Sequence, residues 1–351
     1  MDARENLLRT VRFERPDTIP MVFHINHACW HHYPPQALWD LMAAHPMLFP
    51  DFDATADHAV PETPTYARAD TPFVDPWGCV HETSDDGIMG VVTDHPLADW
   101  AALADYVPPD PNRFNHFGPV DWDDPEAVAN PVGFMKQLRS GEIGHGHTFL
   151  RLCDLRGYEN LLVDMAVEEP RLWRLIEIVE AFNMGLVRNF IDRGRVEWLG
   201  FAEDLGMQQG PMLSPQDFRT YILPSYRRMM DAAREAGCII HMHSDGDIRT
   251  LLDDLIGGGV EVINLQDRVN GIDWIQAKLA GKICVDLDID RQQITPHGTP
   301  ADVDALIREE VEKLGSRDGG LMMIYGLYPG VPLQNVQALM DAMERYATHY
   351  A

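Results

Sequence analysis

From about residue 140 onward, short apolar runs alternate along the chain with longer segments whose apolar residues recur at helical spacing. The apolar runs resemble buried strands and occupy residues 143–149, 196–202, 238–243, 260–265, 283–287 and 321–325. The helical segments between and after them occupy residues 170–191, 215–236, 248–256, 272–279, 300–314 and 333–346. This alternation of strand and helix predicts a parallel sheet that is covered by helices.

The first part of the chain adds a helix, a strand and an excursion. Apolar spacing predicts a helix over residues 3–13, which Pro16 ends, and a first strand over residues 19–25. Residues 60–100 combine many Pro, Gly and Asp with short alternating runs, which predicts a β-hairpin excursion. With one more strand expected between residues 40 and 140, the count approaches eight. We therefore predict an α/β fold with one domain over residues 1–351, a (β/α)8 TIM barrel with an N-terminal β-hairpin excursion, rather than a doubly wound open sheet.

In such a barrel the active site lies where the strands end, so the polar residues that close each apolar run are the candidates. His241, His243 and Asp245 alternate along one strand and therefore share the face that points into the barrel. Two imidazoles and a carboxylate suit zinc or another divalent metal. The alternative is structural: one His hydrogen-bonds in the core, and Asp245 shapes a turn with Gly246.

Other strand ends supply candidate catalytic residues. Glu203 and Asp204 are adjacent, so only one can face the pocket as acid, base or ligand, and the other is expected to be a structural anchor. Asn264 and Tyr328 close two further runs and complete the catalytic candidates. A further group of carboxylates comprises Asp286, Asp288 and Asp290. These three would repel one another unless a cation or the neighbouring Arg291 neutralises them.

Imidazoles also gather after the first strand and on the run near residue 145. His24 and His27 follow the first strand, where a solvated loop is the alternative interpretation. His145 and His147 alternate on their run, and Arg151 continues that face. We take His24, His27, His147 and Arg151 as substrate-binding candidates, because this arrangement suits an anionic substrate group. A core His beside a salt bridge is the alternative.

Composition narrows the classes of partner. The 351 residues contain 28 Lys and Arg against 55 Asp and Glu, so the formal net charge is 28 − 55 = −27. We therefore expect neither nucleic acid nor an anionic membrane surface as a partner. Five Cys without a CxxC spacing favour a reducing compartment, which predicts a cytoplasmic protein. The sequence contains no GxSxG, P-loop or GxGxxG motif, and no apolar stretch near the ~18 residues that a membrane helix needs.

Six segments spread over nearly the whole chain carry a family resemblance. They are RENLLRTVRFERPDTIPM, FVDPWGCVHE, RGYENLLVDMAVEEP, EDLGMQQGPMLSPQDFRTYILPSYRRMMDAAREAGCIIHMHSDGDI, HGTPADV and VPLQNVQALMDAMERY. Together and in this order they resemble the uroporphyrinogen decarboxylase superfamily. The resemblance implies a (β/α)8 barrel, in agreement with the strand and helix pattern.

The resemblance favours one branch of that superfamily. True uroporphyrinogen decarboxylases carry a Gly-Arg-Tyr segment after the first strand, where this chain has FHINHACWHHYPP. The methyltransferase-like branch moves a methyl group between a corrinoid protein and a thiol or folate acceptor, and its thiol-using members hold zinc with a His-x-Cys pair and a later Cys. Here His243-Ser-Asp245 stands in place of His-x-Cys, and no Cys lies between Tyr325 and Pro329. This difference leaves two alternatives, an oxygen-rich metal site or a folate-type methyl acceptor.

We accordingly expect a metal-dependent methyltransferase that acts on a small methylated compound or its corrinoid carrier. His243 and Asp245 are the expected ligands, assisted by His241 or Glu203. The alternative is a decarboxylase or lyase, in which Arg151 holds a substrate carboxylate and Glu203 or Asp204 supplies a proton. A third hypothesis is a corrinoid-docking module without chemistry. The resemblance is also compatible with a homodimer.

Overall fold

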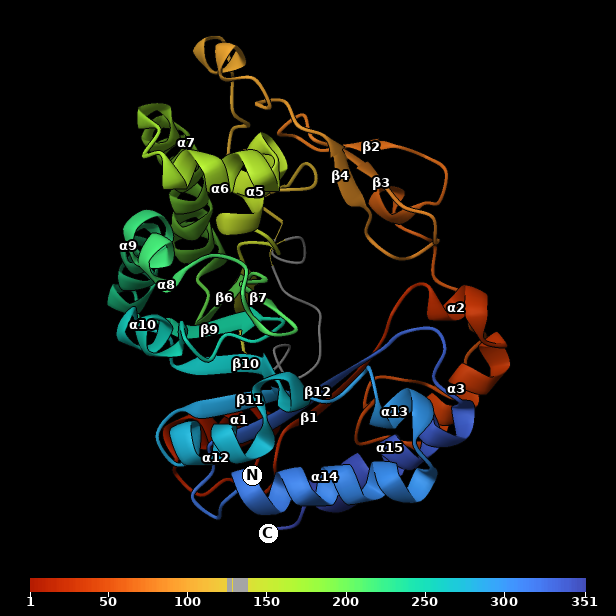
Figure 1. Cartoon of the computed structure of the whole chain (residues 1–351). Coiled ribbons are helices and arrows are strands. Elements are labelled where there is room, and N and C mark those ends of the chain that lie inside the picture. Colours follow the sequence, from red (N-terminus) through yellow and green to blue (C-terminus); the bar gives the residue numbers. More distant parts are fainter. Residues whose placement is uncertain (125–127, 129–137) are drawn as a thin grey trace.

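A parallel sheet of seven strands forms the centre of the computed structural model, which describes residues 1–124, 128 and 138–351. Its strand order is β1-β12-β11-β10-β9-β6-β5, and every neighbouring pair is parallel. The sheet curls into a half-barrel with helices on its outside (Figure 1). The strands are β1 (Met21–Ile25), β5 (Ser140–Glu142), β6 (Trp198–Ala202), β9 (Ile239–Ser244), β10 (Val262–Gln266), β11 (Cys284–Asp288) and β12 (Leu321–Leu327).

The helices follow the strands in the predicted rhythm. They are α1 (Ala3–Arg12), α2 (Cys29–His32), α3 (Pro35–Ala44), α5 (Phe149–Arg156), α6 (Tyr158–Ala166), α7 (Pro170–Asn189), α8 (Pro215–Asp217), α9 (Leu223–Glu235), α10 (Leu252–Gly257), α11 (Asp267–Asn270), α12 (Ile272–Leu279), α13 (Ile294–His297), α14 (Pro300–Leu314) and α15 (Leu333–Ala347). Shorter helical turns lie at Thr65–Ala67, Trp100–Ala104, Phe190–Gly194 and Phe218–Ile222. The TIM-barrel-like α/β fold class is thus confirmed. Within the described part of the chain, no helix is long and apolar enough to cross a membrane.

Two details of the predicted barrel differ from the structure. Residues 143–149 were expected to be a strand, but β5 ends at Glu142 because Gly144 and Gly146 adopt positive φ angles of 101° and 70°, which extended strands do not use. The described residues between 40 and 140 contribute no eighth strand to the parallel sheet, so β1 and β5 are its edges there. Part of that interval, residues 125–127 and 129–137, lies outside the described residues.

The predicted excursion is a three-stranded antiparallel sheet of β2 (Phe73–Val74), β3 (Val80–Glu82) and β4 (Val91–Asp94). At one end, His95 Nδ1 and Leu97 N approach the carbonyl oxygens of Asp154 and Leu155 at 2.7 and 2.9 Å. At the other end, a Cβ on Gly87 would lie 2.2 Å from the backbone nitrogen of Ala28, so only glycine allows this approach. The excursion therefore spans from α5 to the loop after β1.

One hydrophobic cluster closes the half-barrel at the ends where its strands begin. Leu7 and Leu8 of α1 pack with the initial residues of five strands: Trp198, Ile239, Val262, Cys284 and Met322, the last being second in its strand. Asp2 caps α1 by accepting a hydrogen bond from the Glu5 N–H at 2.7 Å. Because this end is filled with apolar side chains, polar chemistry is confined to the opposite end of the strands.

A buried pair of acids lies between α14 and the end of β10. Glu310 is fully buried, and burial together with the nearby Asp267 carboxylate raises the pKa of Glu310 well above its usual range. Two ionised carboxylates that are buried side by side repel each other, so this environment favours the protonated form of Glu310.

The E310Q variant tests this pair. A raised folded-state pKa stabilises the protein below the unfolded pKa of about 4.3, and this stabilisation is lost as the pH rises through the folded pKa. Glutamine stays uncharged at every pH, so we expect the free energy of unfolding of E310Q to fall less than that of the wild type as the pH is raised above neutrality. Urea unfolding at several pH values measures this. E235Q, at an exposed glutamate of α9, should keep the wild-type slope, and equal slopes in all three proteins would contradict a protonated Glu310.

Candidate functional site

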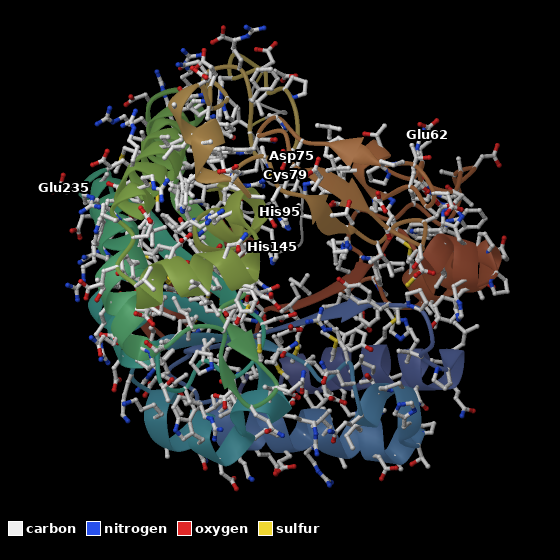
Figure 2. The ribbon with its side chains drawn as sticks, turned by 45° about the horizontal axis from the view of Figure 1, so that its top comes forward. Glu62, Asp75, Cys79, His95, His145 and Glu235 are labelled. Carbon is white, nitrogen blue, oxygen red and sulfur yellow. The ribbon has the colours of Figure 1, made fainter. Side chains whose placement is uncertain are left out.

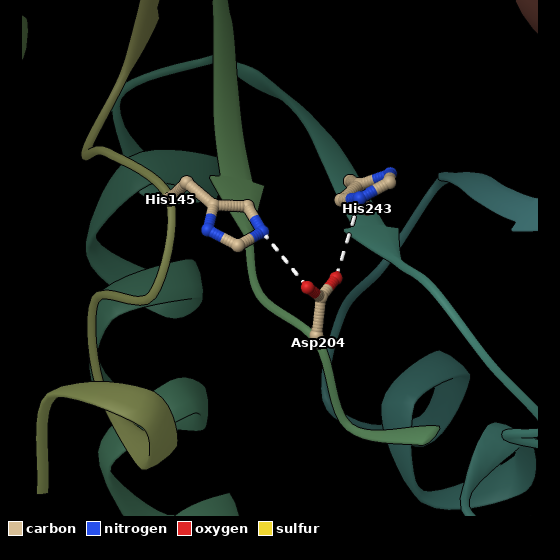
Figure 3. A group of neighbouring side chains, drawn as sticks. All are labelled: His145, Asp204 and His243. Atoms are coloured by element: carbon tan, nitrogen blue, oxygen red, sulfur yellow. Dashed lines mark ion pairs between the residues drawn. The ribbon is translucent and has the colours of Figure 1, made fainter. Parts of the chain in front are cut away.

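Three potential metal ligands meet where β5, β6 and β9 end (Figure 3). His145 lies in the loop after β5, Asp204 follows β6 and His243 lies in β9. Asp204 Oδ2 is 3.3 Å from His145 Nε2, and Asp204 Oδ1 is 3.5 Å from His243 Nε2. One ligand atom from each residue falls within 4.8 Å of the others. The side chains of His145, Asp204 and His243 are 39%, 29% and 23% exposed, so a ligand can reach them.

The loops after β6 and β9 bring Asp204 to His243 by direct backbone contact. A Cβ on Gly246 would lie 2.1 Å from the backbone of Gly206, so both positions require glycine. The Asp245 N–H donates to Asp204 Oδ1 at 3.1 Å, and the Gly206 N–H donates to the Asp245 carbonyl at 3.2 Å. The carboxylate is therefore held in place by the backbone of the strand that carries His243.

Electrostatics within the cluster favour an ionised carboxylate between two imidazoles. Burial alone would raise the pKa of Asp204, but hydrogen bonds to His145 and His243 outweigh it and lower that pKa. Burial would lower the pKa of His243, but Asp204 and Asp245 raise it to about 10. His145 has a raised pKa because its hydrogen bond to Asp204 outweighs burial. The Asp204 carboxylate therefore favours positive charge beside it, which either protons on the imidazoles or a metal ion can supply.

The second nitrogen of His243 is fixed by a hydrogen-bond chain. Asn264 donates its Nδ2–H to the Asp286 carbonyl at 2.7 Å, so its Oδ1 faces His243 and accepts the Nδ1–H. This leaves Nε2 directed at Asp204. Asn264 therefore orients an imidazole rather than touching the open side of the cluster, in the manner of residues that support a ligating His.

His241 was predicted as a ligand, but the structure places it outside the cluster. Its Nε2 lies 2.9 Å from Asp286 Oδ2, and its ring packs 5.3 Å from that of Trp198. His241 shares a strand face with His243 but lies two residues closer to the apolar end, where Trp198 belongs to the closing cluster.

Of the adjacent acids, Glu203 is the structural anchor and Asp204 faces the opening. Glu203 is fully buried and accepts the backbone N–H groups of Thr148, Phe149 and Leu150 at 3.2, 3.0 and 3.0 Å. The Tyr226 hydroxyl donates to the same carboxylate. Glu203 thus occupies the N-terminus of α5, where an acidic group satisfies orphan N–H groups.

The predicted substrate-binding residues are not brought together. His147 is fully buried, and desolvation lowers its pKa to about 4. Arg151 is also buried and pairs with Asp75 of the excursion, so its guanidinium holds two parts of the protein together. Figure 2 labels Asp75 beside Cys79 of the excursion, with His145 below them in that view. His24 is exposed at the end of β1, opposite Gly326 of β12, and His27 follows it half-buried.

A second ionic group borders the cluster. Arg291 places one nitrogen 2.6 Å from Asp288 Oδ2 and 3.2 Å from Asp245 Oδ1, and its guanidinium carbon lies 5.5 Å from the centre of the Tyr328 ring. Asp245 Oδ1 is also 3.8 Å from His243 Nε2. Burial raises the pKa of Asp288 to about 7, against the opposing effect of Arg291. Asp245 was predicted as a ligand; the structure places it beside His243 but neutralised by Arg291.

His145, which contributes the third ligand atom of the cluster, was not among the residues predicted for the site. Its alternation with His147 was the available signal, but a strand was assumed for residues 143–149. In a strand both imidazoles would share one face; in the observed loop, His145 turns to Asp204 and His147 turns inward.

The cluster fits a catalytic metal better than a purely structural one. Tetrahedral zinc with bonds of about 2.0–2.1 Å separates its ligand atoms by about 3.3 Å, and one ligand atom from each of the three residues lies within 4.8 Å of the others, so side-chain shifts of about an ångström would bring them to that spacing. Two imidazoles and one carboxylate supply three ligands and leave a position for a substrate. The hydrogen bond from His243 to Asn264 supplies the outer support that such ligands usually have.

The chain is similar in sequence to one protein family and in fold to a solved methyltransferase. The family model described as Uroporphyrinogen decarboxylase (URO-D) matches residues 149–346. Uroporphyrinogen decarboxylases from two strains of Thermus thermophilus are 28% and 27% identical over 141 residues, and the match spans only 38% of this chain and 38% of each relative. A solved methyltransferase from Methanosarcina mazei aligns over 99% of both chains with a TM-score of 0.61 and 16% identity, a likeness of fold.

Substitutions at the two adjacent acids separate their roles. In E203Q an amide nitrogen faces backbone N–H donors, so we expect the variant to lose about 1–3 kcal/mol of unfolding free energy. D204N should also lose stability at neutral pH, because it removes a carboxylate whose pKa is lowered in the folded protein, but this loss should shrink as the pH falls below the unfolded pKa of about 3.9. Urea unfolding of both proteins checks this, and a stable E203Q would show that Glu203 does not anchor α5.

Proposed function

The chain belongs to the uroporphyrinogen decarboxylase family, and we propose that it is a metal-dependent methyltransferase within that family. It would move a methyl group between a small methylated compound or a corrinoid carrier and an acceptor. The observation that carries this proposal is the open group of His145, Asp204 and His243 at the ends of parallel strands.

These three residues would hold a divalent metal, zinc being the first candidate. Bound there, such a metal supplies a Lewis acid that lowers the pKa of a coordinated thiol, hydroxyl or water, so that a nucleophile forms near neutral pH. The chain's own contribution is positional. Asn264 keeps Nδ1 of His243 protonated, and the backbone of Asp245 fixes the Asp204 carboxylate.

The ligand set differs from the one expected from the sequence. Arg291 neutralises Asp245, and His241 is paired with Asp286 below the cluster. We therefore propose His145 and Asp204 in place of His241 and Asp245, with His243 kept. Methyl transfer requires mainly an aligned donor and an activated acceptor, which a metal beside an open loop region can provide. A corrinoid protein or a folate-type co-substrate stays a prediction from the family resemblance.

Charge at the opening weighs against the alternative of a decarboxylase for a polycarboxylated substrate. Asp204, Asp245 and Asp288 face the same region, and Arg291 is already shared between two of them. Arg151, which was expected to hold a substrate carboxylate, is buried in its pair with Asp75. A carboxylated substrate would therefore meet like charge and would have to displace an existing ion pair.

Metal analysis tests the ligand set. Protein purified without chelator is expected to carry one divalent metal per chain, measured by inductively coupled plasma mass spectrometry. The variants H145A, D204N and H243A should lose this metal. N264L should bind about 10–100-fold more weakly, because it removes the acceptor for His243 Nδ1–H. H241Q is the matched control from the same strand and should retain the metal. Loss in H241Q together with retention in H145A would refute this ligand set.

Methyl transfer is tested with methylcobalamin and a thiol acceptor. The acceptor sulfur bonds the methyl carbon, the electron pair of the cobalt–carbon bond stays on cobalt, and the thiol proton passes to solvent. We expect the visible spectrum of methylcobalamin to change at a rate that D204N abolishes and H241Q preserves. Carbon dioxide release from a panel of carboxylic acids, without any such spectral change, would instead establish the lyase.

A further inference from the structure

A polar cavity of about 250 Å³ adjoins the metal cluster on the side of β10 and β11. Its lining divides by burial into two parts. The buried part holds three acids, Asp267, Asp288 and Asp290, which are 1%, 4% and 6% exposed, and the guanidinium of Arg291 lies beside Asp288. The exposed part carries the guanidinium of Arg268 and the amides of Gln208 and Gln293. The cavity therefore presents negative charge at its floor and a positive charge with amide groups at its rim.

Some of these polar atoms have capacity for a ligand. Asp288 uses Oδ2 for Arg291, and its Oδ1 makes no hydrogen bond within the described residues. Arg268 makes one weak side-chain contact, from its NH2 to Gln293 Oε1 at 3.4 Å, which leaves most of its donors for another acceptor. Asp267, by contrast, accepts the backbone N–H groups of Arg268 and Asp290 and is occupied.

We infer that this cavity binds the dipolar head of a small α-amino acid, with the ammonium group against Asp288 and the carboxylate on Arg268. A ligand with only a carboxylate would be repelled by the acidic floor, and a ligand with only an ammonium group would leave Arg268 unpaired. A molecule with both groups satisfies both ends through charge-assisted hydrogen bonds. A cavity below the usual size range of drug-sized sites also favours a small molecule.

One layer of ion pairs separates the cavity from the metal cluster. Arg291 is 2.6 Å from Asp288 and 3.2 Å from Asp245, and Asp245 is 3.8 Å from His243. A ligand in the cavity would therefore be separated from the cluster by the ion pair of Arg291 and Asp245. That such a ligand takes part in methyl transfer rests on the proposed function, whereas binding of the amino acid does not.

Calorimetry on metal-depleted protein of full length tests the inference with L-methionine as the probe. Two analogues each lack one charge: 3-(methylthio)propylamine has no carboxylate, and 4-(methylthio)butanoate has no ammonium group. We expect L-methionine to bind at least about tenfold more tightly than either, since each analogue loses the charge-assisted hydrogen bonds at one end of the cavity. The R268Q variant should bind L-methionine about tenfold or more weakly than the wild type does. Its affinity for the amine should be unchanged, because the amine has no carboxylate to accept hydrogen bonds from Arg268.

R174Q is the control, since Arg174 is an exposed arginine of α7 that pairs with Glu177. It should bind all three compounds as the wild type does. The inference would be overturned if L-methionine did not bind measurably, or if the three compounds bound with equal affinity. It would also be overturned if R268Q lowered the affinities for L-methionine and for the amine equally. Because no metal is present, these outcomes are independent of the metal content and methyl transfer that decide the proposed function.

Discussion

The buried carboxylate of Glu203 sets the geometry on which the site depends. It binds three N–H groups at the start of α5 and the hydroxyl of Tyr226 in α9. Burying a charge costs several kcal/mol, which is offset here by four hydrogen bonds to the ionised group. Because the loop of His145 runs directly into α5 and Asp204 is the next residue after Glu203, this one anchor fixes the distance between two of the three ligand atoms.

The balance of charge around the opening explains why the cluster attracts a cation. Asp204, Asp245 and Asp288 lie close together, and Arg291 compensates the last two. Asp204 is left with two imidazoles, whose pKa values it raises. Protons on these imidazoles and a divalent metal are alternative ways to meet the same electrostatic demand, so metal binding there would release protons.

The fold could be predicted from periodicity because the apolar runs and helical segments are long and regular, whereas the site depended on a few backbone angles. The alternation of runs predicted the parallel sheet, and the positions of Asp204, His243 and Asn264 at strand ends followed from it. His145 could not be selected, since the positive φ angles of Gly144 and Gly146 decide which way it points. Arg151 appeared to be a substrate group because its partner, Asp75, lies 76 residues away in the chain.

Arg291 lines the neighbouring cavity and pairs with Asp245, which lies 3.8 Å from His243 of the metal cluster, so one ion pair connects the two sites. If a ligand's ammonium group competes for Asp288, Arg291 is left with Asp245 alone. The pair of Arg291 with Asp245, at 3.2 Å, would then hold the guanidinium in place. The charged residues that replace the expected His-x-Cys arrangement thus form a continuous row from the cavity wall through Arg291 and Asp245 to His243.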